Sequence, residues 1–223
     1  MSFYLLILIL AFCIPFLFSF HPKVQFSKYF KVVCGSITIS AIPFILWDIV
    51  FTKIGVWGFN DEHLLGFRIF SLPIEELLFF WLIPFCCIFS YYLIEKYNIV
   101  IYKSPDYKYI NTIIAILLLC TALLNYNHIY TFCCLSICSI VLFIETHYIK
   151  IVNYNYYYVA FIFLFIPFML VNGSLTGSFF DKVVVWYNNS CILGIYLITI
   201  PIEDLVYSFL MIHVNLISYK LFL

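Results

Sequence analysis

The chain has 223 residues, of which 65% are hydrophobic and only 10% are charged, and its formal net charge is zero. An ordinary soluble domain has about 25% charged and about 45–50% apolar residues. The composition therefore excludes a soluble globular domain. The sequence also contains no basic patch that would indicate nucleic-acid binding. We expect an integral membrane protein.

Seven apolar stretches follow one another along the chain, separated by short loops. Most are close to the roughly 20 residues that a helix needs to cross a bilayer, although the fifth is short. The first has no basic segment before it and no small-residue cleavage site after it, so we expect a retained helix rather than a signal peptide. The stretches are residues 2–20, 32–52, 69–94, 109–126, 129–144, 154–172 and 190–214.

Basic residues are divided unequally between the two sides of the predicted membrane segments. Cytoplasmic loops are enriched in Lys and Arg, which places the odd-numbered loops and the C-terminus in the cytoplasm and the N-terminus outside the cell membrane. The cytoplasmic set is Lys23, Lys28, Lys31, Lys96, Lys103, Lys108, Lys150 and Lys220, and the opposite set is Lys53, Arg68 and Lys182.

The nine cysteines lie in apolar surroundings with no CxxC pair and no histidine cluster, so we expect them to pack as small hydrophobic residues rather than to bind metal. The sequence also contains no dinucleotide fingerprint, and we expect no cofactor. Its 19 Tyr and 26 Phe fit membrane-interface belts and a lipid-like cavity.

An internal repeat relates the two halves of the chain. Residues 73–80 read PIEELLFF and residues 201–208 read PIEDLVYS, and the upstream segments 43–48 and 167–172 also align, at a slightly different offset. One extra crossing separates the two triplets of helices, so both triplets run in the same direction.

The predicted fold is therefore all-α, a polytopic membrane protein of about seven helices built as two parallel three-helix repeats joined by a linker helix. The predicted division of the chain is residues 1–104, 105–127 and 128–223.

Five acidic residues fall within membrane stretches that contain no Lys or Arg. An ionisable residue inside a membrane is costly and indicates function by default. Without a cationic partner, burial favours the neutral, protonated carboxyl group, which suits a proton donor. The alternative is that these acids only stabilise the start of a helix near Pro73 or Pro201. The five residues are Asp48, Glu75, Glu76, Glu203 and Asp204.

We expect Glu75 and Glu203 to be the leading proton donors, followed by Glu76 and Asp204. Consecutive helical residues point about 100° apart, so only one acid of each pair can face fully into one cavity. Asp48 aligns with Asn172, which cannot ionise, so a positioning role is expected there. The residues expected to contact a substrate are Trp47, Asp48, Trp57, Phe79, Asn172 and Tyr207.

At these residues the chain resembles the heterodimeric-type bacterial lycopene cyclases, whose two small membrane subunits are fused in some bacteria, in archaea and in fungi. The matching segments are PFILWD at 43–48, FTKIGVWGFN at 51–60, LG at 65–66, LPIEE at 72–76 and PIED at 201–204. The second half departs from the pattern at Asn172 and at Trp186, which lies one position out of register with Trp57.

The resemblance implies conversion of the open ψ-ends of a carotenoid such as lycopene into β-ionone rings, as found in β-carotene. This cyclisation is a proton-initiated isomerisation without redox chemistry, and it would require a strong acid in a dry aromatic pocket. The resemblance leaves open whether the chain forms homo-oligomers or associates with other carotenoid enzymes. Two other classes fit the sequence less well: a small-solute transporter with parallel triple-helix repeats, and a structural membrane subunit.

The charge asymmetry generates a prediction of topology. Cysteine labelling or reporter fusions should place the loops near Lys28, Lys103 and Lys150 in the cytoplasm. A cytoplasmic location for the loop at 53–68 would contradict it.

Overall fold

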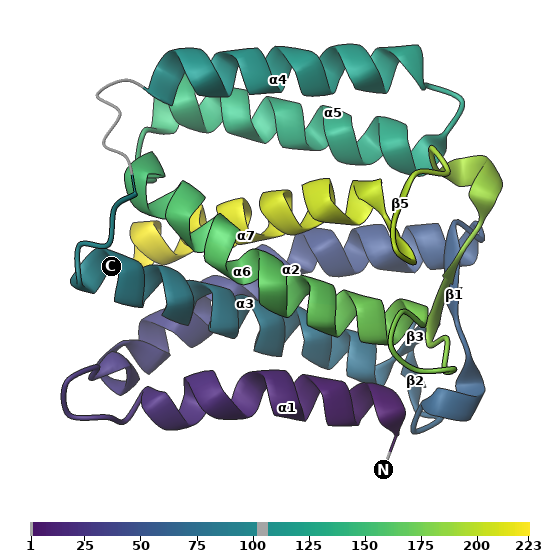
Figure 1. Cartoon of the computed structure of the whole chain (residues 1–223), viewed down its shortest axis with the longest axis horizontal. Helices are drawn as coiled ribbons and strands as arrows, with labels where there is room; N and C mark the ends of the chain where they lie inside the picture. The colour runs from purple at the N-terminus through teal and green to yellow at the C-terminus, as the bar shows by residue number, and fades with distance from the viewer. Residues whose placement is uncertain (1, 102–106) are drawn as a thin grey trace.

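A computed structural model describes residues 2–101 and 107–223, and most of these residues are helical. The helices lie roughly side by side along one common direction (Figure 1). The α-helices within the described residues are α1 (Phe3–Phe18), α2 (Phe30–Lys53), α3 (Ile74–Lys96), α4 (Tyr107–Leu124), α5 (Ile129–Ile144), α6 (Tyr154–Thr176) and α7 (Ile202–Phe222).

Six helical segments among the described residues are long and apolar enough to cross a membrane. The fifth apolar stretch gains length because α5 continues through the π-helical turn Glu145–Ile149. Helix α1 has 16 residues, which corresponds to about 24 Å, and is the shorter apolar helix of the set. The predicted all-α, multi-pass membrane fold is confirmed.

Three short antiparallel strand pairs lie at one end of the helices. Two of them, β2–β3 and β5–β6, form hairpins directly before α3 and α7, so these helices begin later than the apolar stretches at 69–94 and 190–214 indicate. Hydropathy cannot separate an apolar hairpin from the helix that follows it. The strands are β1 (Trp57–Phe59), β2 (Arg68–Ile69), β3 (Leu72–Pro73), β4 (Val185–Tyr187), β5 (Tyr196–Leu197) and β6 (Ile200–Pro201).

The order of elements repeats along the chain. The series α1, α2, β1, β2, β3, α3 recurs as α5, α6, β4, β5, β6, α7, with α4 between the two series. Figure 1 shows that the two sets of three helices run in the same direction. The exact division of the chain stays a prediction, and its first boundary, at 104/105, lies outside the described residues.

The two halves are interlocked by their helices. In each half the first helix packs on the third, as α1 on α3 and α5 on α7, whereas the second helix packs on the third helix of the other half, as α2 on α7 and α6 on α3. Helix α4 packs on α5 at the edge of the molecule (Figure 1). The centre of the structure therefore lies between the two third helices.

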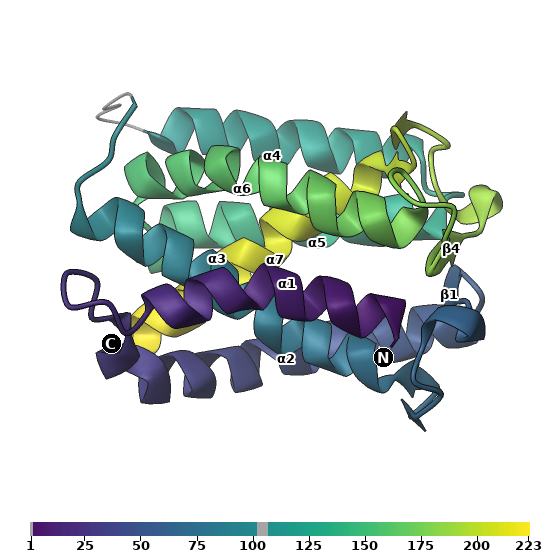
Figure 2. The same ribbon diagram turned by 60° about the horizontal axis from the view of Figure 1, so that its bottom comes forward.

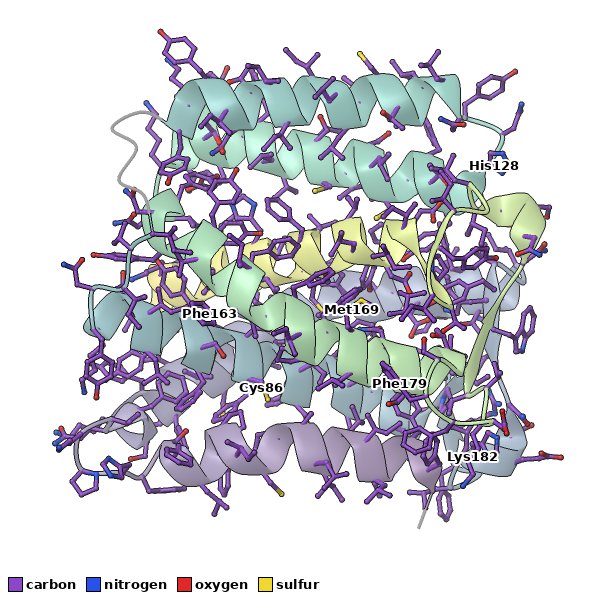
Figure 3. All side chains as sticks on the ribbon, in the orientation of Figure 1. Cys86, His128, Phe163, Met169, Phe179 and Lys182 are labelled. Carbon is purple, nitrogen blue, oxygen red and sulfur yellow. The ribbon has the colours of Figure 1, made fainter. Side chains whose placement is uncertain are left out.

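The basic residues are separated in space as well as in sequence. The α1–α2 loop with Lys28, the end of α3 with Lys96, and Lys150 after α5 lie at one end of the helices, and Lys182 lies at the other (Figures 1 and 3). Lys103 lies outside the described residues. Which end faces the cytoplasm stays a prediction.

Strands β1 and β4 join the two halves in a ribbon with internal two-fold symmetry (Figure 2). Gly58 pairs with Trp186 at its centre. On one side the Asn60 amide donates to the Val184 carbonyl at 2.8 Å, and on the other the Asn188 amide donates to the Val56 carbonyl at 2.8 Å. Equivalent residues of the two halves thus exchange places about one axis.

The centre of this ribbon generates a prediction of stability. A Cβ atom at Gly58 would overlap the indole of Trp186, so Gly58→Ala should lower the thermal unfolding temperature in detergent, with a cost of about 1–3 kcal/mol. In the control Gly35→Ala, within helix α2, the new methyl group would lie 3.4 Å from the Phe222 ring of α7, and stability should be unchanged or higher. Equal stability of the two variants would contradict the close approach at Gly58.

Candidate active site

A cavity of about 800 Å³ lies between α1, α3, α6 and α7 and reaches the β1–β4 ribbon. Its wall consists mainly of apolar side chains, among which Phe is the most frequent. Three acids line it, Asp48, Glu76 and Asp204, and no Lys, Arg or His is present among the described residues that line it. The cavity therefore combines an apolar interior with unpaired carboxyl groups.

Glu76 lies in the first turn of α3 and is partly exposed to the cavity. The Tyr4 hydroxyl, from α1, donates a hydrogen bond to its Oε2 atom at 2.6 Å. Its Oε1 atom has no hydrogen-bond partner among the described residues. Glu76 thus has one oxygen that is held and one that is free to interact with a bound molecule.

Asp204 occupies the equivalent position in α7, and both of its oxygens are held. The Tyr130 hydroxyl donates to Oδ1 at 2.7 Å, and the Tyr187 hydroxyl donates to Oδ2 at 2.7 Å. Burial, with the neighbouring charge of Asp204, raises the pKa of Tyr187 well above its ordinary value. The Tyr187 phenol therefore remains a hydrogen-bond donor near neutral pH.

Asp48 approaches the cavity from α2. The Trp57 indole N–H donates to its Oδ1 atom at 2.6 Å and the Thr52 hydroxyl does so at 3.2 Å, whereas Oδ2 is buried without a partner among the described residues. Its counterpart Asn172 also lines the cavity but donates to the Phe168 carbonyl at 3.3 Å. The two halves thus contribute different groups at this position.

Glu75 and Glu203 are fully buried and do not line the cavity. Glu75 accepts a hydrogen bond from the Leu65 amide at 2.6 Å. Glu203 accepts one from the Leu193 amide at 2.7 Å and one from the Thr131 hydroxyl at 2.5 Å. In each adjacent pair of acids, one residue faces the cavity and the other holds the loop before the hairpin.

The two adjacent pairs of acids, Glu75–Glu76 and Glu203–Asp204, each lie in the first turn of a helix. Pro73 and Pro201 directly precede α3 and α7. The acids therefore lie where the helix dipole favours negative charge, as a purely helix-stabilising role requires. That role does not account for the position of Glu76 and Asp204 on the cavity wall. The helix starts and the cavity coincide at this end of the molecule.

Aromatic rings surround the three cavity acids. Trp57, Phe79 and Tyr207 line the cavity, whereas Trp47 lies behind it, with its ring 5.4 Å from that of Tyr207. The rings of Trp57 and Tyr130 are 5.0 Å apart in an edge-to-face arrangement. Aromatic faces attract cations, so this wall could stabilise positive charge in a bound molecule.

Three tyrosines that were not expected from the sequence hold the cavity acids: Tyr4, Tyr130 and Tyr187. Tyr4 and Tyr130 occupy equivalent positions near the starts of α1 and α5, which are the first helices of the two halves. A search of the repeat for matched polar residues outside the Pro-Ile-Glu segments would have found this pair. Tyr187 has Phe59 as its counterpart and carries no such signal.

In a comparison with protein-family models, the chain matches the family described as lycopene cyclase over residues 1–94 and 127–222. The segment between the two matched regions contains α4. No match was found among curated proteins or among solved structures.

The hydrogen bonds that Glu203 accepts allow a test that distinguishes the effect of its accepting oxygen from the effect of its charge. Glu203→Gln keeps an oxygen that can accept from Leu193 and Thr131, so its thermal stability should stay close to that of the wild type. Glu203→Leu removes the acceptor and should cost about 1–3 kcal/mol, as expected for unsatisfied buried donors. Thermal unfolding of the purified protein measures both, and equal losses in the two variants would show that the charge matters more than the acceptor.

Proposed function

The chain belongs to the lycopene cyclase family, and we propose that it closes the ψ-ends of a carotenoid such as lycopene into β-ionone rings by acid catalysis inside the bilayer. The observation that carries this proposal is the group of three carboxyl side chains at one end of an apolar cavity lined with aromatic rings. An apolar polyene fits such a wall, and a carboxyl group is the acid that the reaction requires.

The reaction is an isomerisation and transfers no electrons overall. A carboxylic acid gives its proton to C2 of the terminal C1=C2 double bond, which leaves a tertiary cation at C1. The C5=C6 double bond attacks C1 and forms the ring bond between C1 and C6, and the positive charge moves to C5. Loss of the proton from C6 then forms the ring double bond, so one proton enters and one leaves.

We assign the proton donor to Glu76, because its Oε1 atom is free while Tyr4 holds the other oxygen. Asp204 is less suited to donate, since phenol hydroxyls already donate to both of its oxygens. Asp204 instead supplies a fixed negative partner for the developing cation, an arrangement in which groups need not reorient during the reaction. Asp48, held by Trp57, is the second candidate for this role.

Glu75 and Glu203 act in this proposal as positioning residues. Each precedes a cavity acid in the chain and fixes the loop that leads into the hairpin and the helix start. The two acids expected first from the sequence therefore support the reaction through Glu76 and Asp204.

The aromatic wall contributes in two ways. The faces of Trp57 and of the neighbouring rings stabilise the tertiary cation by cation–π attraction, which is typically worth about 0.5–2 kcal/mol for each contact. The apolar lining also keeps water away from the cation, which would otherwise be trapped as an alcohol.

Glu75 and Glu76 are adjacent, so their glutamine variants form a matched pair that tests which residue is the proton donor. In a bacterial host that accumulates lycopene, Glu76→Gln should reduce ring formation by about 10²–10⁴-fold, because the amide cannot donate an acidic proton. Glu75→Gln keeps the acceptor for Leu65 and should retain most of the activity. Pigment analysis measures both, and the reverse order of loss would make Glu75 the donor.

Activity of the isolated protein tests the proposed function itself. The purified chain in lipid vesicles containing lycopene should form rings without any other protein, whereas a structural subunit for other pigment enzymes would not. In deuterated water each ring should carry about one deuterium at C2, as expected for a single acid-catalysed proton transfer. A strict requirement for flavin or nicotinamide after thorough cofactor removal would contradict the non-redox mechanism.

A further inference from the structure

Aromatic side chains line the end of the cavity that holds the acids. Trp57 and Tyr187 of the β1–β4 ribbon line this end, and Phe180 lines it from the loop between α6 and β4. The ring of Phe180 lies 5.3 Å from that of Phe3 at the start of α1, and the Lys182 ammonium group lies 4.9 Å from the centre of the Phe3 ring.

From the acids, the cavity runs along one face of α3. Its floor includes Glu76, Phe79, Ile83, Cys86 and Ser90, which follow helical spacing. Fourteen residues separate the first from the last, which corresponds to about 21 Å at 1.5 Å per residue. An extended tetraterpene is longer than this floor, so its far end must lie outside the cavity.

The opening of the cavity lies between α1 and α6. These helices approach each other near the start of α1 and diverge away from it, as Figures 1 and 2 agree. Figure 3 labels Cys86 of α3 in the space between them. Leu10 and Ile14 on α1 and Phe165 on α6 line the cavity and are also 63%, 66% and 39% exposed, so they form its rim.

The two helices beside this opening are uncharged. Neither α1 nor α6 contains a charged residue. In a chain whose helices cross the membrane, exposed Leu, Ile and Phe side chains in the middle of two helices face the hydrocarbon of the lipids. The opening therefore leads into the bilayer and not into water.

We propose that a polyene substrate enters sideways from the lipid through the gap between α1 and α6, with its open end first, and that Leu10, Ile14 and Phe165 control this passage. The inference rests on the proposed function, because it takes the occupant to be the carotenoid. The leading end reaches Glu76, while the trailing end stays in the lipid. The rim residues act on access of the substrate and have no part in the ring closure.

Variants at the rim test the route. Leu10→Trp and Phe165→Trp narrow the opening, and each should lower kcat/KM for lycopene in vesicles by about tenfold, within the range of about 10–200-fold that steric discrimination by a pocket gives. The value of kcat should not change at saturating lycopene. Leu17→Trp and Phe163→Trp change exposed residues of the same helices that do not line the cavity, and both should behave like the wild type.

Unchanged kcat/KM in both rim variants, or a loss confined to kcat, would overturn the proposal. If the tryptophan variants do not fold, Leu10→Ala provides the second measurement, because a wider opening should give a kcat/KM at least equal to that of the wild type. A clear fall in kcat/KM for Leu10→Ala with normal thermal stability would then overturn it.

A substrate with a modified far end gives an independent test. A carotenoid with one open end and a bulky sugar at the other should still form a ring at its open end, because the far end stays outside. Failure to convert it, when lycopene is converted, would overturn the proposed route. Failure to convert lycopene itself would overturn the proposed function, so the two results are distinguishable.

Discussion

The burial of carboxyl groups among apolar helices is the constraint on which the rest of the structure depends. A buried polar group needs a hydrogen-bond partner, and the four acids at the starts of α3 and α7 obtain theirs from residues outside these two helices. Glu75 and Glu203 obtain donors from loop amides, while Glu76 and Asp204 obtain them from tyrosines on the first helix of their own half. These hydrogen bonds link the loops before the hairpins, the helix starts and the first helix of each half.

The two halves of the chain are related by the internal repeat, yet they contribute different side chains to the cavity. Glu76 and Asp204 are equivalent by the repeat, and so are Tyr4 and Tyr130. The acids of both halves nevertheless face one shared cavity. The symmetry is broken by Tyr187, which gives Asp204 a second donor, and by Asp48, whose counterpart is Asn172. These differences leave Glu76 with one oxygen held, whereas both oxygens of Asp204 are held.

The helices and the shared direction of the two triplets could be predicted from the sequence, because hydropathy and the repeated Pro-Ile-Glu segments report them directly. Which acid of each pair faces the cavity could not be predicted, since this depends on where the helix starts, and the hairpins moved the start of α7 to Ile202. The partners of the acids were also hidden. Tyr4 is 72 residues from Glu76, and only the packing of α1 on α3 brings them together.

Helix α4 contributes no residue to the cavity and lies between the two segments that match the family. Its presence decides the orientation of the second half in the membrane, because it changes the number of crossings between the two halves. A unit of three crossings ends on the opposite side of the membrane from where it starts, so a direct fusion of two such units would invert the second one. One additional crossing corrects this, and α4 is that crossing. If the chain were divided on both sides of α4, the two three-helix units would have to insert in the same orientation to pack as they do here.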